Sequence, residues 1–373
     1  MILRSDGITV FIDKNNQQIE LIYSKIIITS LIGGYYLENK VVCLVPKERF
    51  ITTGVRIPEQ LSFIFSDTRD EDEIIELCKN ASFLFCSSGT SYISESTVEK
   101  LNSIRMIQVD GVGYEKIDVR ACANNSIPVA NNANVNALTV AEAALGMIIT
   151  LQRRYLVADS YIKARKYQVI HERFVKEGLN ELSGRRVGLI GLGAIGIELA
   201  KLLIRLEADV YYNDIFWRTP EFEAEIGLKR MTREEIFTEC DIISLHVPLT
   251  ESTRHLIDEK ALSMMKKTAI LINTARGEVI DQVALVNALE SGHLYGVAID
   301  TIHPEPPMDD HPLLNLSEEA KERIMFTPHI AGVTLEAFRR MLLNGIENII
   351  RAIKGEEILN VVNGISKPRD YKV

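Results

Sequence analysis

The chain has 373 residues, of which 46% are hydrophobic and 25% are charged, and its formal net charge is −9. At about 100–200 residues per domain, this length predicts two or three domains. The composition excludes a chain that is disordered, collagen-like or coiled-coil throughout. The negative charge, with no cluster of lysine and arginine, argues against nucleic acid or an anionic membrane as the main partner.

The five cysteines are widely spaced, and none of them forms a C-x-x-C pair. They lie in or beside apolar runs, which predicts buried thiols in a reducing compartment. The N-terminus shows no signal-peptide pattern. The longest apolar stretch near it, residues 26–36, is about half as long as a membrane span. We therefore expect a soluble cytoplasmic protein with no membrane association.

The first part of the chain predicts a hairpin followed by an α/β domain. Residues 7–13 and 19–23 read as two strands around the polar turn K-N-N-Q-Q, without an assignable role. From Lys40 onward, short apolar runs alternate with charged helical segments, which is typical of a parallel α/β sheet. The runs are residues 40–46, 82–86 and 104–109, and the helical segments include 69–80 and 93–103.

A nearly uniformly apolar segment, residues 137–154, separates this domain from a second one. Such a helix is expected to be buried on all sides, between domains or in a subunit interface. The second α/β run has six predicted strands, and the final helix, residues 334–354, is expected to pack back on the first domain. The six strands are residues 186–190, 208–213, 241–246, 269–273, 294–299 and 323–327.

The sequence therefore predicts two doubly wound α/β domains with parallel sheets. The chain crosses between them twice, near Asn136 and near Gly332. The expected domains are residues 1–136 with 333–373, and residues 137–332 inserted between these two parts.

A glycine-rich loop opens the second domain. Gly191, Gly193 and Gly196 form G-x-G-x-x-G between a predicted strand and a predicted helix. In this motif the glycines permit a tight turn, a close approach of pyrophosphate, and close packing of helix on strand, while the phosphates meet the helix N-terminus. Asp214 ends the next predicted strand, where a carboxylate binds the adenine-ribose hydroxyls. We expect NAD rather than NADP, and only Arg218 argues weakly the other way.

Five polar residues follow other strands of this domain. Ligands of doubly wound folds bind beyond the carboxyl ends of the strands, so these side chains are expected to converge near a nicotinamide ring. An arginine can clamp a carboxylate with two hydrogen bonds, and a histidine beside a carboxylate is suited to acid/base work. Position alone also allows non-functional alternatives: the arginine could simply be exposed, the glutamate could cap a helix, and the histidine could be buried in the core. The five residues are His246, Arg276, Asp300, Glu305 and His329.

Three motifs that contain these residues resemble the D-isomer-specific 2-hydroxyacid dehydrogenases. They are N-T-A-R-G-E-V-I-D (273–281), G-V-A-I-D-T-I-H-P-E-P-P (296–307) and T-P-H-I-A-G (327–332), and the resemblance extends over residues 40–362. It implies that Arg276 binds the substrate carboxylate and that His329 is the acid/base. It also implies that Glu305 bonds to His329 and that Asp300 binds the nicotinamide carboxamide.

The same resemblance implies the architecture and the other cofactor contacts. An NAD-binding Rossmann domain is inserted into a flavodoxin-like substrate domain, and family members are typically dimers with the helix at 137–154 in or near the interface. Ala194 stands where many members carry a polar or basic residue, so pyrophosphate binding is expected to depend on backbone N–H groups. The other implied cofactor residues are Ile195, His246, Val247, Pro248 and Thr274.

Two loops of the first domain are expected to contact the substrate. One carries Ser88 and Gly89, whose backbone N–H groups could hold the carboxylate, and the other carries Gly111 and Tyr114, which could shape the side-chain pocket. Plain turns are the alternative for both loops. Phosphoglycerate dehydrogenases carry a pair of arginines in the loop that corresponds to Ser88 and Gly89, and neither loop of this chain has such a pair.

The sequence thus predicts an NAD-dependent enzyme that interconverts a small D-2-hydroxy acid and its 2-oxo acid. A phosphite- or formate-type dehydrogenase on the same scaffold is one alternative, although formate enzymes usually carry glutamine at the position of Glu305. A non-catalytic NAD-sensing protein is another. The histidines and aspartates of residues 303–312 lie in a proline-rich loop, and no metal site is expected there.

Overall fold

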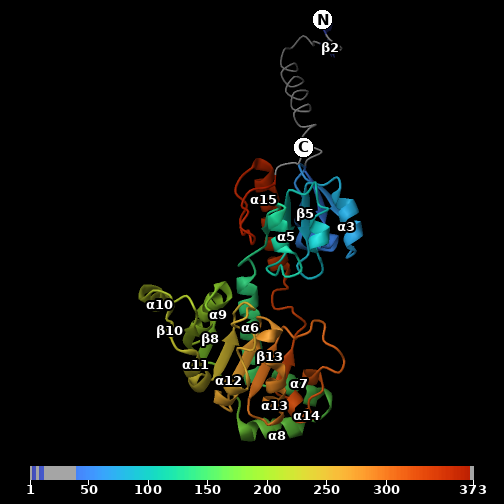
Figure 1. The fold of residues 1–373 in the computed structure, drawn as a ribbon. Helices are drawn as coiled ribbons and strands as arrows, with labels where there is room; N and C mark the ends of the chain where they lie inside the picture. The colour runs from blue at the N-terminus through green and yellow to red at the C-terminus, as the bar shows by residue number, and fades with distance from the viewer. Residues whose placement is uncertain (1, 6–7, 12–38, 370–373) are drawn as a thin grey trace. The chain divides into compact units, whose positions relative to one another are not determined.

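The computed structural model describes residues 2–5, 8–11 and 39–369. The chain divides into two compact units (Figure 1). One unit contains Met1–Ala133 and Phe338–Val373, and the other contains Asn134–Ala337. The second unit is therefore inserted between two parts of the first, and the chain passes between the units after Ala133 and after Ala337. These points lie a few residues from the predicted crossings near Asn136 and Gly332.

The first unit contains a five-stranded parallel sheet in the order β4-β3-β5-β6-β7. Numbered along the chain this is the 2-1-3-4-5 order of flavodoxin-like folds, which confirms the predicted fold class. The edge strand β4, only partly buried, and the two-residue strand β7 were not predicted. The strands are β3 (Lys40–Cys43), β4 (Ser62–Phe65), β5 (Phe83–Cys86), β6 (Met106–Val109) and β7 (Val129–Ala130).

The last helix, α15 (Leu335–Lys354), packs on this sheet as predicted. Its residues Leu342, Ile346 and Ile349 are buried in one cluster with Phe85 of β5. A Cβ at Gly345 would lie 2.5 Å from the Phe85 ring, so glycine permits this close contact. The other helices of the unit are α2 (Lys47–Thr53), α3 (Glu71–Cys78), α4 (Glu95–Val98) and α5 (Val119–Asn124).

Near the N-terminus, β1 (Ile2–Ser5) pairs antiparallel with β2 (Ile8–Phe11). The strand β2 coincides with part of the predicted strand at residues 7–13. Residues 19–23, its predicted partner, lie outside the described residues, so that pairing stays a prediction.

The second unit contains a seven-stranded parallel sheet in the order β10-β9-β8-β11-β12-β13-β14. Six strands match the predicted runs. Numbered along the chain, all seven lie in the order 3-2-1-4-5-6-7, which contains the 3-2-1-4-5-6 order of Rossmann folds. The remaining strand, β10, adds two exposed residues at the edge and was not predicted. The strands are β8 (Arg186–Ile190), β9 (Asp209–Asn213), β10 (Lys229–Arg230), β11 (Ile242–Leu245), β12 (Ile270–Asn273), β13 (Gly296–Ile299) and β14 (Ile324–Phe326).

Helices α6 (Ala137–Gln152) and α9 (Ala194–Arg205) lie together in one core of this unit. Leu199 and Leu203 of α9 share that cluster with Ile148 of α6. Within the chain α6 is not buried on all sides, because Leu138 is 44% exposed. The remaining helices are α7 (Tyr155–Lys163), α8 (Tyr167–Glu177), α10 (Pro220–Ile226), α11 (Arg233–Glu239), α12 (Glu259–Met264), η1 (Gly277–Val279), α13 (Gln282–Glu290), η2 (Pro312–Leu314) and α14 (Glu318–Lys321).

All five cysteines are buried and free, as predicted. Burial raises the pKa of Cys78 to about 12, so its thiol stays protonated at neutral pH. Among the described residues, no helix combines the length and apolar character that a membrane span requires.

Candidate active site

The glycine loop joins β8 to α9, and each of its glycines meets a different constraint. Gly191 has a φ of +96°, and a Cβ there would lie 2.6 Å from the carbonyl oxygen of His246. A Cβ at Gly196 would lie 2.5 Å from the Gly191 oxygen. At Gly193 a Cβ would meet no atom within 4 Å, so the backbone there is open to a ligand.

The N-terminus of α9 is suited to an anion. The helix begins at Ala194 after Gly193, and no side chain caps it. The N–H groups of Ala194, Ile195 and Gly196 are therefore left for a phosphate, aided by the helix dipole. This arrangement explains how Ala194 can stand at a position where a polar side chain is common.

Asp214 and Arg218, after β9, both hold the glycine loop. The Asp214 carboxylate accepts the N–H of Leu192 at 2.6 Å and that of Phe216 at 2.8 Å. Arg218 donates from Nη2 to the Leu192 oxygen at 2.5 Å. Each oxygen of Asp214 keeps acceptor capacity for a ribose hydroxyl. Arg218 is thus directed at a backbone carbonyl of the loop.

Buried polar atoms without partners among the described residues lie at the ends of neighbouring strands. They include His246 Nδ1 after β11, Thr274 Oγ1 after β12 and Thr301 Oγ1 after β13. Buried polar atoms are normally hydrogen-bonded, so these atoms fit a polar ligand. Val247 adjoins the glycine loop, since its Cγ1 lies 3.1 Å from a Cβ built at Gly191. With Pro248 next in the chain, these residues fit the NAD site that the sequence predicts.

His246 itself is a neutral group. Its Nε2 lies 2.9 Å from Ser244 Oγ, and burial lowers the pKa of the ring to about 4. The imidazole is therefore uncharged at neutral pH and is not suited to give up a proton there.

His329 and Glu305 form the expected pair. His329 Nδ1 lies 2.8 Å from Glu305 Oε2. Because a carboxylate only accepts, the proton between them belongs to Nδ1, which leaves Nε2 for a substrate. The hydrogen bond to Glu305 raises the pKa of His329, against opposing contributions from desolvation and from Arg276. The pair thus has the arrangement of a general acid/base.

Asp300 fixes the backbone around His329. Its carboxylate accepts hydrogen bonds from Thr327 Oγ1 at 2.5 Å, from the Ile330 N–H at 2.8 Å and from the Ala331 N–H at 3.0 Å. His329 has a φ of +54°, a conformation that is strained for a non-glycine residue. The structure therefore gives Asp300 a positioning role that the sequence did not predict.

Arg276 follows β12 and begins the turn η1. Its backbone oxygen accepts a hydrogen bond from Asn273 Nδ2 at 2.9 Å, and its own Nη1 donates to the Ala275 oxygen at 2.9 Å. A Cβ at Gly277 would lie 2.7 Å from the nitrogen of His303, so this turn contacts the segment that leads to Glu305. The charge of Arg276 also acts to lower the pKa of His329, so the two groups interact electrostatically.

In the first unit the two predicted substrate loops contact each other. A Cβ at Gly111 would lie 2.3 Å from Ser88 Oγ. The Ser88 N–H donates to Asp110 Oδ1 at 2.7 Å, so this group is already used and Gly89 remains as the backbone donor. Tyr114 packs against the hydrophobic core of the unit.

Sequence patterns contained no signal for Arg49, which pairs with Asp110 from a position 61 residues away. It likewise missed the contact at 3.3 Å between His303 Nδ1 and Glu278 Oε1. Among the described residues, no group of three or more His, Cys, Asp or Glu side chains could hold a metal ion.

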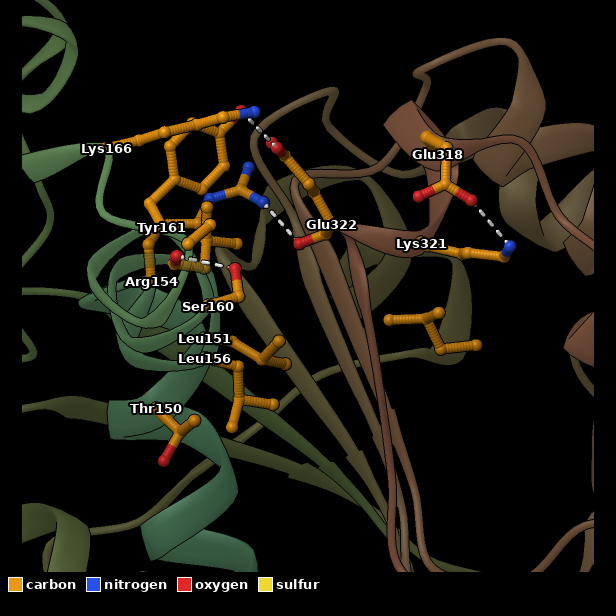
Figure 2. Close-up of a pocket in the computed structure, with 13 residues that line it drawn as sticks. Thr150, Leu151, Arg154, Leu156, Ser160, Tyr161, Lys166, Glu318, Lys321 and Glu322 are labelled. Atoms are coloured by element: carbon orange, nitrogen blue, oxygen red, sulfur yellow. Dashed lines mark hydrogen bonds and ion pairs between the residues drawn. The ribbon is translucent and has the colours of Figure 1, made fainter. Parts of the chain in front are cut away.

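A cavity of about 560 Å³ lies elsewhere in the second unit (Figure 2). Its lining includes Leu151, which contacts Gly296 at the start of β13, and Ile324 at the start of β14. Arg154 and Tyr161 bond to Glu322 beside it, at 3.0 and 3.1 Å. The strands are parallel, so this cavity is at the opposite edge of the sheet from Arg276 and His329.

A Rossmann unit whose glycine loop leads into an uncapped helix N-terminus is typical of dinucleotide-binding proteins. Residues 145–331 match the family described as D-isomer specific 2-hydroxyacid dehydrogenase, NAD binding domain. The chain belongs to this family and is an NAD-dependent oxidoreductase acting on 2-hydroxy acids.

Similar proteins include a glyoxylate reductase of Korarchaeum cryptofilum, 36% identical over 290 residues, which are 78% of this chain and 85% of that protein. A hydroxypyruvate reductase of Thermotoga maritima is 32% identical over 310 residues, 83% of this chain and 96% of that protein. The structure of a D-lactate dehydrogenase from Aquifex aeolicus, complexed with NAD and lactic acid, has a TM-score of 0.72 at 27% identity. That similarity covers 87% of this chain and 99% of that one.

Proposed function

We propose that this protein interconverts a small, unphosphorylated D-2-hydroxy acid and its 2-oxo acid, with His329 as the acid/base. The observation that carries the proposal is the contact at 2.8 Å between His329 Nδ1 and Glu305. The left-handed backbone of His329, held by Asp300, supports it, because such strain is typical of functional residues.

Each charged residue has a defined task in this reaction. NAD, when bound, supplies the hydride acceptor for oxidation and, in its reduced form, the donor for reduction. Arg276 binds the substrate carboxylate through its guanidinium fork and so orients the carbon that reacts. In reduction, His329 gives the proton of Nε2 to the carbonyl oxygen, and in oxidation neutral Nε2 takes the hydroxyl proton. Glu305 stabilises the charged imidazole.

The cofactor residues are assigned in the same way. The N–H groups at the start of α9 would hold the pyrophosphate, and Asp214 would accept the adenine-ribose hydroxyls. His246, Val247, Pro248 and Thr274 would line the site after β11 and β12. Asp300 would contact the carboxamide of the nicotinamide in addition to its bonds to the 327–331 segment.

The test is the oxidation of NADH with a panel of acids. The panel holds glyoxylate, pyruvate, hydroxypyruvate, 2-oxobutyrate, branched 2-oxo acids and 3-phosphohydroxypyruvate. We expect turnover of unphosphorylated acids, because residues 86–92 contain no arginine or lysine for a phosphate dianion. If the phosphorylated acid is the best substrate, that assignment is wrong.

Two further outcomes would point to the alternative functions. Reduction of NAD by phosphite or formate, without turnover of any 2-oxo acid, would indicate oxidation of those anions. Binding of NADH without turnover of any compound would indicate an NAD-sensing protein.

We also propose that the protein is a cytoplasmic homodimer with α6, α7 and α8 at its interface. A cytoplasmic location agrees with five buried, free cysteines. Six large apolar residues on α7 and α8 are about half exposed or more, which is unusual for a surface that meets only water. They are Tyr155 (52%), Leu156 (50%), Ile162 (47%), Tyr167 (61%), Val169 (56%) and Val175 (72%).

A further inference from the structure

The segment that carries Glu305 lies at the surface of the second unit. Residues 303–306 are exposed, and the side chains of Glu305 and His329 are 40% and 49% exposed. Burial therefore does not fix the contact between these two side chains. Because exposed ion pairs are weak by themselves, the position of Glu305 depends on other contacts of its segment.

His303 is the residue at which this segment is held. Its backbone oxygen accepts a hydrogen bond from Gln282 Nε2 at 2.7 Å. Its ring nitrogen Nδ1 lies 3.3 Å from Oε1 of Glu278, whose side chain is only 17% exposed. Only Pro304 separates His303 from Glu305, and the φ angle of a proline is fixed. A displacement of His303 is therefore passed on to Glu305.

Glu278 belongs to the turn that follows Arg276. It lies in η1, two residues after Arg276. The oxygen that faces His303 is also 3.9 Å from Arg254 Nη2, so Glu278 has a cationic neighbour besides the imidazole. The Glu278 carboxylate thus connects the turn after β12 with the segment after β13.

We propose that Glu278 and His303 are positioning residues that hold Glu305 against His329. Their contact keeps the exposed segment after β13 beside the turn after β12, and this keeps the Glu305 carboxylate within hydrogen-bond distance of His329 Nδ1. The catalytic meaning of this inference rests on the proposed function, in which Glu305 stabilises the charged imidazole.

The test measures the pKa of His329 directly, by NMR titration of protein with ¹³C-labelled histidines, and it needs no turnover. His329→Ala identifies the resonance. His303→Ala should lower this pKa by about 0.2–0.7 pH units, because Glu305 then contacts the ring for a smaller fraction of the time. The other charged groups that act on the ring, Arg276 and Asp300, are unchanged in this variant.

The direction of the change separates position from charge. Loss of a positive charge at His303 would remove a repulsion from the charged His329 ring and would raise its pKa. His303→Asn also removes the imidazole, but its Nδ2 can replace Nδ1 as the donor to Glu278, so the wild-type pKa should be retained. A lower pKa in His303→Ala alone therefore reports the position of Glu305.

Two further variants complete the test. In a Glu305→Gln background, His303→Ala should cause no further change, because both variants then act through the same contact. Glu251→Ala, at an exposed position of the same unit, is the control and should leave the pKa of His329 unchanged. An unchanged or raised pKa in His303→Ala would overturn the proposal, and so would a further fall in the Glu305→Gln background.

Oxidation of NADH by the same proteins keeps the two proposals apart. If the wild type reduces no 2-oxo acid but His303→Ala lowers the pKa of His329, the proposed function fails and the positioning role stands. If the wild type is active and the pKa is unchanged in His303→Ala, the positioning role fails and the proposed function stands.

Discussion

His329 combines a left-handed backbone, a raised pKa and a carboxylate partner in one residue. Each feature has a cause in a neighbour. Asp300 holds the flanking backbone, and Glu305 favours the charged ring. The histidine is thus prepared for proton transfer by residues that lie 29 and 24 positions before it in the chain.

Removing the imidazole should abolish the proton transfer. His329→Ala is expected to lower kcat by about 10²–10⁴ at all pH values, since general acid/base catalysis contributes that much. NADH affinity, measured by fluorescence titration, should be unchanged. A variant with near wild-type kcat would show that another group transfers the proton.

Asp214 should select NAD over NADP. We expect kcat/KM to be at least about tenfold higher with NADH, which corresponds to about 1.4 kcal/mol. Asp214→Asn keeps an acceptor for one backbone N–H of the loop but removes the charge that repels a 2′-phosphate. The ratio of kcat/KM with NADH to kcat/KM with NADPH should therefore fall. Steady-state kinetics with both cofactors measure it. Equal efficiency of the wild type with NADPH would contradict this role.

At the scale of elements, two glycines in the turn between β8 and α9 have different tasks: one is needed for the stability of the fold and the other for cofactor binding. Gly191→Ala places a side chain at a φ of +96° and against His246, so it should destabilise the protein by about 1–3 kcal/mol. Gly193→Ala meets no protein atom within 4 Å and should leave Tm unchanged, while it raises KM for NADH by obstructing the pyrophosphate. Thermal melts and kinetics of both variants test this, and a Tm loss for Gly193→Ala would contradict it.

The strands that sequence reasoning found and missed differ in burial and length. Strands such as β8 and β11 are fully or almost fully buried apolar runs, and these stand out in a sequence. The edge strand β4 is only partly buried, and β7 and β10 have two residues each. Such short or exposed segments owe their conformation to the neighbouring strand that they pair with, which is not visible locally.

The same contrast applies to the site. The edge at which Arg276, Glu305 and His329 lie could be predicted because each follows a strand, and parallel strands end at one edge. The pairing of Glu305 with His329 was implied by the family resemblance, and the catalytic roles stay predictions. The contact between Arg49 and Asp110, and the bonds from Asp300 to the His329 loop, join residues far apart in the chain. These side-chain contacts depend on details of packing that a single sequence does not display.

At the scale of the whole molecule, the proposed dimer has a direct test. Val175 on α8 is 72% exposed, so Val175→Glu should not disturb the fold of the chain. In an interface the buried charge would be costly, and the variant should become monomeric. Light scattering after size-exclusion chromatography measures the mass. A wild-type protein that elutes as a monomer would contradict the proposal, and the exposed Glu76→Lys is a matched control that should leave the mass unchanged.

The central claim, that His329 is the acid/base and Glu305 its partner, is tested most directly by pH profiles of kcat/KM for the wild type and Glu305→Gln. The hydrogen bond to Glu305 raises the pKa of His329, so the charged ring persists to higher pH. Reduction needs that form and should fall as pH rises through the pKa, while oxidation needs the neutral form and should fall as pH drops through it. Removing the charge of Glu305 lowers this pKa, and both limbs should move to lower pH. Limbs that stay where they are in the wild type would contradict the account.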